Sequence, residues 1–461
     1  MAPILWFRRD LRFFANDALI EAVENGAKEA LFFVCQKQWQ THNAAPIQID
    51  LLKRRVAWLG QALCDYGIYL HIVEVDDFSD TPQALKRFCE KHNTQRVYAN
   101  REYEINECQR DKKCLELGID LTLFDGDLVA PPHSVTTKSG DMFKVFTPFK
   151  KAWLKKFEQH HFFIPSWPLE KSNKHTRWHL PECLQGDGSS LKWPIDDDTI
   201  KTIANHFIQN KCEEYQSVRD IPSIKGTSGL SPYLALGMVS VKQLLAQLQL
   251  FYPDILHTTT KPEFCWVNEL IWREFYRHLI IAFPNLCRHE NFNKKYNAVQ
   301  WQYDATQFKA WCEGKTGYPI VDAAMRQLNQ TGWMHNRLRM IVASFLTKHL
   351  LIDWRHGEKY FMQHLIDGDF ASNNGGWQWA ASTGCDAQPY FRIFNPITQS
   401  EKFDPQGDFI RKYVPELGDV PSKYIHFPHD YLVTKQNTQY AQPLVDHKVA
   451  RVRALEAFKV S

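Results

Sequence analysis

The first 125 residues alternate short apolar runs with longer amphipathic stretches. The apolar runs have the length of β-strands and fall at Ile4–Phe7, Ala30–Cys35, Tyr69–Val75, Arg96–Ala99 and Asp120–Phe124. Helical patterns, such as Leu51–Cys64 and Ala84–His92, lie between them. Short buried strands alternating with helices are typical of βαβ units, so this part predicts a doubly wound parallel sheet. No GxGxxG motif follows the first run, which argues against a standard dinucleotide site there.

The pattern changes twice further along the chain. Residues 126–200 are rich in proline and contain the tract Gly186-Asp-Gly-Ser-Ser190, which predicts a long connection with little regular structure. From about residue 200 the apolar positions follow a helical period, and strand alternation is scarce. We therefore predict an α/β domain at residues 1–130, a connection at 131–200 and an all-α domain at 201–461.

One stretch of the helical part has an apolar stripe on one side and mixed groups on the other. If Trp333–Leu351 is a helix, Leu338, Ile341, Val342, Phe345 and Leu346 form its core stripe. The opposite side then carries Trp333, Asn336 and Met340. That side is either a pocket wall or a second buried face.

A second stretch, Phe264–Phe283, is apolar almost all round and predicts a buried helix. It nonetheless carries Glu269, Trp272 and Arg273. Because a buried carboxylate must be paired or serve a function, two interpretations are open. Glu269 either pairs with Arg273 one turn further on, or lies beside Trp272 at the edge of a substrate site.

Composition and charge limit the classes of protein. Aromatic residues reach 13%, with 15 tryptophans, which fits either stacking surfaces or a tryptophan-rich core. The net charge is only +3, so any nucleic-acid footprint must be local. Eleven cysteines without CxxC pairs indicate a reduced, cytoplasmic protein and argue against a disulfide framework or a zinc site. We see no signal peptide and no stretch long enough to span a membrane.

The run Ser372–Asp386 contains Trp377 and Trp379 two positions apart, shortly after Asp367-Gly-Asp369. Two tryptophans at i and i+2 cannot share a helical face, so one can face a bound ring while the other faces into the protein. The two acids lack the rest of a calcium loop, and no histidine lies at a ligand-like spacing. We therefore expect no metal.

The segment Gly226–Ala235 predicts the start of a helix, with Ser231 as N-cap and Pro232 at the first helical position. Free N–H groups there, with the hydroxyls of Thr227, Ser228 and Ser231, can hold a phosphate. A capped helix needs no ligand, so this segment alone does not define a site.

Three motifs carry a resemblance to a known family. These motifs resemble, in the same order, parts of the flavin domain of the photolyase/cryptochrome family, and in particular of the class I cyclobutane pyrimidine dimer photolyases. The motifs are Trp266–His278, Trp333–Met340 and Ser372–Asp386. The resemblance covers nearly the whole chain. It implies an N-terminal antenna domain and a helical FAD-binding domain. It also implies light-driven repair of ultraviolet-damaged DNA, by electron transfer from photoexcited, reduced, anionic FAD to a flipped-out dimer.

The resemblance assigns roles to individual residues. Asn373 would lie near flavin N5, the acids Asp367 and Asp369 would pair with Arg339, and Glu269 would act on the dimer. The full set of FAD contacts is Tyr215, Thr227, Ser228, Gly229, Leu230, Ser231, Trp266, Arg273, Trp333, Arg339, Asp367, Asp369 and Asn373. Contacts to the lesion and its strand are Arg219, Trp272, Asn336, Arg337, Met340, Trp379 and Gln399. An electron relay that reloads an oxidised flavin is Trp377, Trp354 and Trp301.

Antenna positions that face a folate, 5,10-methenyltetrahydrofolate, match His42, Asn43, Asn106, Glu107, Cys287 and Arg288. Relatives have lysine where this chain has Arg288, so the planar guanidinium of arginine replaces the compact ammonium of lysine. A deazaflavin is the alternative antenna. The expected partner is damaged DNA, with no membrane, no obligate protein partner and a monomeric state. Three alternatives are a cryptochrome photoreceptor, a dark flavin oxidoreductase and a (6-4) photolyase, which typically has histidines at the positions of Asn336 and Met340.

Overall fold

The computed structural model describes residues 2–165, 167–171, 177–386 and 392–460. The chain forms two compact units. The first comprises residues 1–213, 228–287 and 366–369, and the second comprises 214–227, 288–365 and 370–461. The boundaries expected near residues 130 and 200 stay predictions, since these units are built from interleaved segments.

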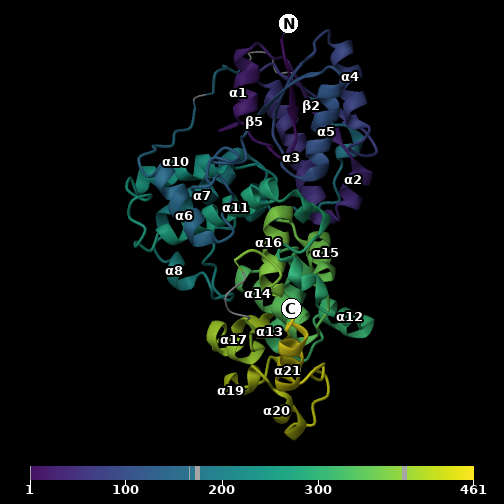
Figure 1. The fold of residues 1–461 in the computed structure, drawn as a ribbon, viewed down its shortest axis with the longest axis vertical. Helices are drawn as coiled ribbons and strands as arrows, with labels where there is room; N and C mark the ends of the chain where they lie inside the picture. Colours follow the sequence, from purple (N-terminus) through teal and green to yellow (C-terminus); the bar gives the residue numbers. More distant parts are fainter. Residues whose placement is uncertain (1, 166, 172–176, 387–391, 461) are drawn as a thin grey trace. The chain divides into compact units, whose positions relative to one another are not determined.

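A parallel five-stranded sheet organises the start of the first unit (Figure 1). Its strands are β1 (Ile4–Phe7), β2 (Glu29–Val34), β3 (Tyr69–Glu74), β4 (Arg96–Asn100) and β5 (Asp120–Phe124), in the order β3-β2-β1-β4-β5. The sequence predicted all five within one or two residues of their ends. The order makes the sheet doubly wound, with a switch point between β1 and β4.

Helices cover the sheet between successive strands. They are α1 (Asp17–Glu24), α2 (Gln36–Thr41), α3 (Pro46–Cys64), α4 (Thr81–Lys91) and α5 (Ile105–Glu116). Ile4, Trp6, Leu31 and Phe33 lie on one face of the sheet because they alternate along their strands, and they form a buried core with residues of α4 and α5, including Phe88. The crossover β3-α4-β4 therefore uses this face.

The predicted irregular connection contains a regular helix, α6 (Phe146–Phe157), which corrects the expectation for residues 131–200. Its buried side chains are Phe146, Phe149, Trp153 and Phe157. Further on, η1 (Glu182–Leu184) is a short 3-10 helix, and α7 (Asp197–Asn210) begins within the predicted connection.

The glycine-rich tract of the connection is fixed to α3. Asp50 accepts hydrogen bonds from the backbone N–H groups of Gly188 and Ser190 at 3.0 and 2.9 Å. Arg55, which is fully buried, donates to the carbonyl of Ile195 and pairs with Asp197, both at 2.5 Å. The tract is therefore packed structure and part of the first unit.

The rest of the first unit is helical. It contains α9 (Ser231–Ala235), α10 (Val241–Phe251) and α11 (Phe264–Ala282), followed by the 3-10 helix η2 (Pro284–Arg288). Helix α11 is 19 residues long and confirms the predicted helix at Phe264–Phe283. No helix among the described residues is both long enough and apolar enough to cross a membrane.

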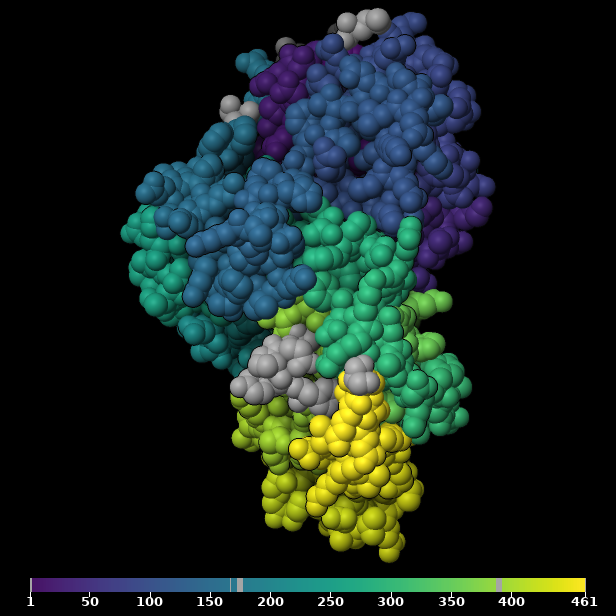
Figure 2. Space-filling model, in the orientation of Figure 1, coloured from purple at the N-terminus to yellow at the C-terminus, as the bar shows by residue number. Residues whose placement is uncertain are grey.

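The second unit is also helical in the part of it that is described. Its elements are α8 (Tyr215–Val218), η3 (Lys294–Ala298), α12 (Ala305–Glu313), α13 (Pro319–Thr331), α14 (Asn336–Ser344), η4 (Phe345–His349), α15 (Trp354–His364), α16 (Phe370–Ala381), α17 (Pro396–Phe403), α18 (Asp408–Tyr413), η5 (Pro415–Leu417), α19 (Ser422–Ile425), α20 (His429–Thr434) and α21 (His447–Ala457). Figure 2 shows the C-terminal segment with α21, in yellow, on the surface of this unit.

The stretch predicted as one helix, Trp333–Leu351, is shorter and composite. Helix α14 begins at Asn336, its N-cap is His335, and from Phe345 the backbone continues as the π-helical turn η4. Trp333 therefore precedes the helix, which corrects its expected place on the helical face. The predicted core stripe is confirmed, because Leu338, Ile341, Val342, Phe345 and Leu346 are all buried.

Candidate functional site

One face of α11 stays partly exposed although the helix is otherwise buried. Cys265, Asn268, Glu269, Trp272 and Tyr276 are half-buried and recur every three or four residues, so they form a single stripe. The sequence predicted a helix buried all round, and the structure corrects this. The stripe places Glu269 and Trp272 one turn apart on an accessible surface, as a substrate edge requires.

Trp272 has one ring face already covered. The ring of Phe146, at the start of α6, stacks on it with centroids 3.6 Å apart and planes 6° apart. Only the other face of the indole can take a flat ligand. Sequence reasoning missed Phe146 because the segment was assigned to an irregular connection.

Asp369, the second of the two acids before α16, is held by an ion pair with Arg277. Arg277 donates to both oxygens of Asp369, at 2.8 and 3.2 Å, and also contacts Asp127 at 2.5 Å. Burial alone would raise the pKa of Asp127, but Arg273 and Arg277 together lower it to about 2. Asp127 and Arg277 were not predicted. Arg273, an expected FAD contact, is bound to Asp127 at 2.5 Å, and the expected pairing of Arg339 stays a prediction.

The segment before α9 differs from the predicted capped helix. The N-cap is Leu230, not Ser231, and Pro232 follows within the first turn of a helix only five residues long. The hydroxyl of Ser228 accepts the backbone N–H of Leu230 at 3.3 Å. Gly229 has a φ of +68°, and nothing lies within 4 Å of the place where a Cβ would be, so the backbone there is open to a ligand.

In the second unit, α16 separates its two tryptophans as predicted. Trp377 is 2% exposed, whereas Trp379 is half-buried. Trp377 lies against Gly357 of α15 and meets Phe361 edge-on, with ring centroids 4.9 Å apart. Trp377 therefore faces into the protein, and Trp379 is the one that can reach a ligand.

Asn373 is oriented by the backbone of α15. Its amide nitrogen donates to the carbonyl of Glu358 at 3.0 Å. Among the described residues no donor contacts the amide oxygen, so that oxygen is presented as an acceptor. The side chain of Glu358 is itself buried and held by Asn374 at 2.8 Å and by His289 at 2.7 Å, which fixes the carbonyl that Asn373 uses.

The three relay tryptophans lie in the second unit and differ in burial. Trp377 and Trp354 are buried, and Trp301 is half-buried. The indole N–H of Trp354 donates to Asn291 at 3.0 Å, and Trp301 packs edge-on against Phe458 at 5.5 Å. The burial order agrees with a relay that ends at the surface.

The candidate phosphate-binding arginines share one acid. Arg337 donates two hydrogen bonds to Asp220, at 2.8 and 3.2 Å, and Arg219 lies 3.9 Å from the same carboxylate. Arg337 also stacks over Phe403 at 4.5 Å. Asp220 therefore offsets part of the positive charge that the sequence assigned to DNA binding.

The remaining candidates in the second unit are accessible in different degrees. Asn336, the first residue of α14, is exposed, and Met340, Gln399, Thr227, Trp333 and Arg339 are half-buried. Tyr215 is buried in α8. In the first unit, Trp266 is buried on α11, and its ring centroid lies 4.9 Å from that of Phe207. No described contact joins Trp266 to a polar group, which fits a packing role for its ring.

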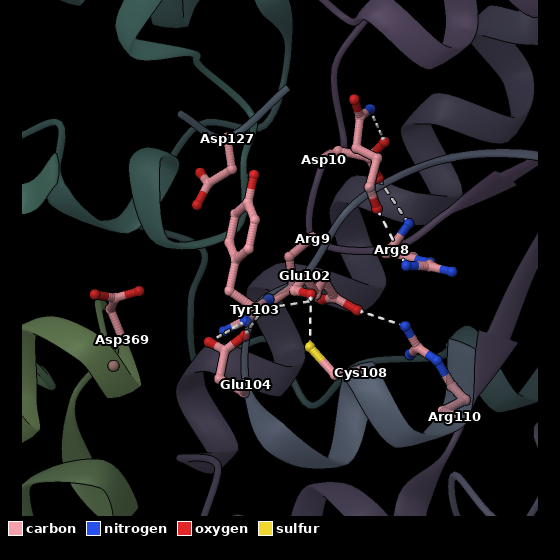
Figure 3. A network of polar contacts seen from close by, with 12 residues as sticks. Arg8, Arg9, Asp10, Glu102, Tyr103, Glu104, Cys108, Arg110, Asp127 and Asp369 are labelled. Carbon is pink, nitrogen blue, oxygen red and sulfur yellow. Dashed lines mark hydrogen bonds and ion pairs between the residues drawn. The ribbon is translucent and has the colours of Figure 1, made fainter. Parts of the chain in front are cut away.

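A small cavity, partly open to solvent, lies at the carboxyl ends of the strands in the first unit. Arg8, Arg9 and Asp10 follow β1, and Asn100 ends β4 with residues 101–104 after it, so the cavity is at the switch point of the sheet. Figure 3 shows its charged walls. Arg9 pairs with Glu102 at 3.0 Å and with Glu104, and Arg110 reaches Glu102 at 3.0 Å, so the charges are largely compensated.

Four of the antenna candidates come together near the start of α5. His42 lies 3.0 Å from the amide of Asn106, and the Cys287 thiol interacts with the backbone of Ile105. Burial, with Glu104 and Glu102 nearby, raises the pKa of Glu107 to about 8, and one of its oxygens is buried without a hydrogen bond from any described residue. Asn43 follows His42 at a φ of +57°. Arg288, the last residue of η2, is exposed.

Comparisons with known proteins agree with this architecture. Residues 3–168 match a family model described as DNA photolyase, and residues 266–460 match the FAD binding domain of DNA photolyase. The deoxyribodipyrimidine photo-lyase of Vibrio cholerae is 47% identical, and the alignment covers 99% of each chain. A bacterial class III photolyase structure from Agrobacterium tumefaciens has a TM-score of 0.85 at 36% identity, covering 99% of this chain and 97% of that one. The cryptochrome of Synechocystis has a TM-score of 0.82 at 27% identity, covering 99% of both chains.

A parallel sheet domain followed by a helical flavin-binding part is thus the architecture of photolyases and cryptochromes, and the predicted fold class is confirmed. The chain belongs to the DNA photolyase family.

Proposed function

We propose that this protein is a light-dependent DNA repair enzyme that splits cyclobutane pyrimidine dimers. The observation that carries the proposal is the 47% identity to a deoxyribodipyrimidine photo-lyase over 99% of both chains. When bound, reduced FAD excited by blue light supplies one electron to the dimer and regains it after the ring opens, so the reaction has no net redox change.

The FAD would be held by the residues that the family resemblance assigns. The open backbone at Gly229 fits a close approach by a phosphate. The outward amide oxygen of Asn373 fits an N–H donor, which the reduced flavin has at N5 and the oxidised flavin lacks. Asn373 therefore favours the reduced cofactor, as the proposed reaction requires. Asp369 is held in place by its ion pair with Arg277.

The dimer would be bound by Glu269, Trp272, Asn336, Met340 and Trp379. The face of Trp272 that Phe146 does not cover can stack on a pyrimidine, and the amide of exposed Asn336 can donate to a pyrimidine carbonyl. Glu269 lies one turn before Trp272 on the accessible stripe of α11, where it can act on charge that develops on the base. Arg219, Arg337 and Gln399 would contact the damaged strand.

A folate antenna would bind at His42, Asn43, Asn106, Glu107, Cys287 and Arg288. The pterin ring of a folate presents two adjacent N–H donors, which match a buried carboxyl with an unsatisfied oxygen such as that of Glu107. A deazaflavin is the alternative class of antenna.

We also propose a cytoplasmic monomer that acts on damaged DNA without an obligate protein partner. No disulfide is formed among the cysteines that the structure describes, which supports a reducing compartment.

Repair of ultraviolet-damaged oligothymidine tests the proposed function. Protein with its flavin reduced is mixed with the damaged oligomer, and thymine absorbance is followed under blue light and in the dark. Recovery only in the light is expected. No recovery, with bound and reduced FAD confirmed by its spectrum, would contradict repair and favour a cryptochrome-type photoreceptor.

A further inference from the structure

Three side chains far apart in sequence meet at the edge of the sheet in the first unit. Glu29 begins β2, His71 lies in β3, and His92 caps the C-terminus of α4. One ligand atom from each lies within 4.8 Å of the others. The strand register explains why Glu29 and His71 are close. His71 is paired with Leu31, and Glu29 lies two residues before Leu31 on the same face of the sheet.

The contacts within this Glu29–His71–His92 cluster leave one histidine unsatisfied. The His71 Nε2 lies 2.6 Å from a Glu29 carboxylate oxygen. In contrast, the His92 Nε2 is buried and has no hydrogen-bond partner among the described residues. A buried ring nitrogen without a partner is costly, which calls for a group that the protein chain does not supply.

Aromatic packing holds the two imidazoles in place. The ring of His92 stacks on Phe88 at 4.3 Å and 26°, and it meets the ring of His71 edge-on at 5.0 Å. His71 is also packed edge-on against Phe88 and Tyr69, at 5.1 and 4.7 Å. The ligand atoms are therefore preorganised on rigid elements, and little side-chain freedom is lost when a ligand binds.

The chemistry of the cluster selects one class of ligand. Two imidazoles and one carboxylate are a donor set for Zn²⁺ and similar transition-metal ions, whereas Ca²⁺ and Mg²⁺ take oxygen ligands. The C-terminal end of a helix also favours a cation, because its last carbonyls point toward it. The three residues are all half-buried, so solvent can supply a fourth ligand.

We propose that Glu29, His71 and His92 form a binding site for a zinc-like divalent cation that joins β2, β3 and the end of α4. This site was not expected from the sequence, because its ligands are separated by 42 and 21 positions and match no ligand spacing. None of its three residues is among those assigned to FAD, the lesion or the antenna, and the site does not depend on the proposed function.

Zinc titration of untagged, FAD-loaded protein pretreated with a chelator tests the site. Calorimetry should show one zinc site per chain. Glu29→Gln and His92→Ala should each lower the zinc affinity by more than about 100-fold, because loss of a residue that only supports a ligand costs up to about that much. His161→Ala, which removes an exposed histidine outside the cluster, should leave the affinity unchanged. An absence of zinc binding, or equal binding by both cluster variants and the wild type, would overturn the proposal.

A second measurement on the wild-type protein covers the case in which a variant fails to fold. Acylation of histidines by diethylpyrocarbonate, read by mass spectrometry, should be slowed by zinc at His71 and His92 and not at His161. Equal acylation of His92 with and without zinc would contradict the assignment.

Discussion

Gly357 of α15 lies directly against the indole of Trp377 on α16. A Cβ built on Gly357 would come within 2.1 Å of the Trp377 Cη2 atom and within 2.7 Å of a methyl of Leu346. The absence of a side chain at this one position lets the two helices approach closely enough to bury Trp377. The glycine thus fixes the position of Trp377, one of the three tryptophans that the family resemblance assigns to the electron relay.

Gly357→Ala should therefore destabilise the protein by about 1–3 kcal/mol, because the added methyl overpacks a buried contact. Urea unfolding of the FAD-loaded protein measures the change. Gly376→Ala on α16 is the matched control, since nothing lies within 4 Å of its Cβ position, and it should be neutral or stabilise by up to about 1 kcal/mol. Equal effects of the two substitutions would show that Trp377 is not confined by Gly357.

Trp354→Phe should block photoreduction of oxidised flavin and leave repair by chemically reduced enzyme intact. The reason is that the relay reloads the flavin outside the repair cycle, and phenylalanine is much harder to oxidise than tryptophan. Flavin absorbance under blue light with an external reductant measures the first effect, and thymine recovery measures the second. Trp58→Phe, in the first unit, is the control. If the chemically reduced Trp354→Phe protein failed to repair dimers, Trp354 would have a role beyond reducing the flavin again.

Trp272→Ala should weaken binding to dimer-containing DNA by about 1–3 kcal/mol, because a base stacks on the face of the indole that Phe146 does not cover. Undamaged DNA should bind as before.

Glu269→Ala, on the same stripe, should lower the repair yield more than the affinity. Fluorescence anisotropy and quantum yield separate the two effects. Equal losses of yield and affinity in Glu269→Ala would contradict an action on the dimer itself.

Asp220→Asn should tighten binding to DNA and make it more sensitive to salt. Asp220 holds Arg337 with two hydrogen bonds, so its removal frees a guanidinium for phosphate and raises the salt slope by about one. Arg337→Gln should have the opposite effect. Affinity measured over a range of salt concentrations gives the slopes, and an unchanged slope in both variants would place this pair outside the DNA surface.

Glu107 predicts a pH dependence of folate binding. Its pKa of about 8 means that the carboxyl is mostly protonated at pH 7 in the antenna-free protein. Two pterin N–H donors favour the ionised form, so binding releases a proton and tightens as the pH rises toward 8, then levels off. Calorimetry in buffers of different ionisation enthalpy measures the release. Glu107→Gln should abolish it, and proton release that persists in Glu107→Gln would point to another group.

The strands and the core stripe of α14 could be predicted because their signal is local. Each strand is a short apolar run, and the stripe from Leu338 to Leu346 repeats with a helical period. Helix α6 was missed although its buried residues Phe146, Phe149, Trp153 and Phe157 are spaced by three or four. Prolines surround the helix and four lysines interrupt its apolar pattern, which hides that spacing in the sequence.

The site could be predicted from the sequence only where motifs resemble a family. Asp127 and Arg277 could not be found in this way, because their ion pairs depend on residues that meet only after folding. The partner of Arg337 was missed for the same reason, since Asp220 lies 117 positions earlier in the chain. Long-range pairing leaves no periodic trace in a single sequence.

The interleaving of the two units has a consequence for how the chain is made. Arg277 joins Asp127 to Asp369, and Gln48 donates to the carbonyls of Ile366 and Gly368 at 3.1 and 2.7 Å. The first unit therefore recruits a segment that leaves the ribosome after residues 288–365 of the second unit. Although domains tend to fold in the order of their synthesis, this one cannot complete its contacts until residue 369 has emerged. In a nascent chain that stalls before that point, Arg277 has Asp127 but not Asp369 as an ion-pair partner.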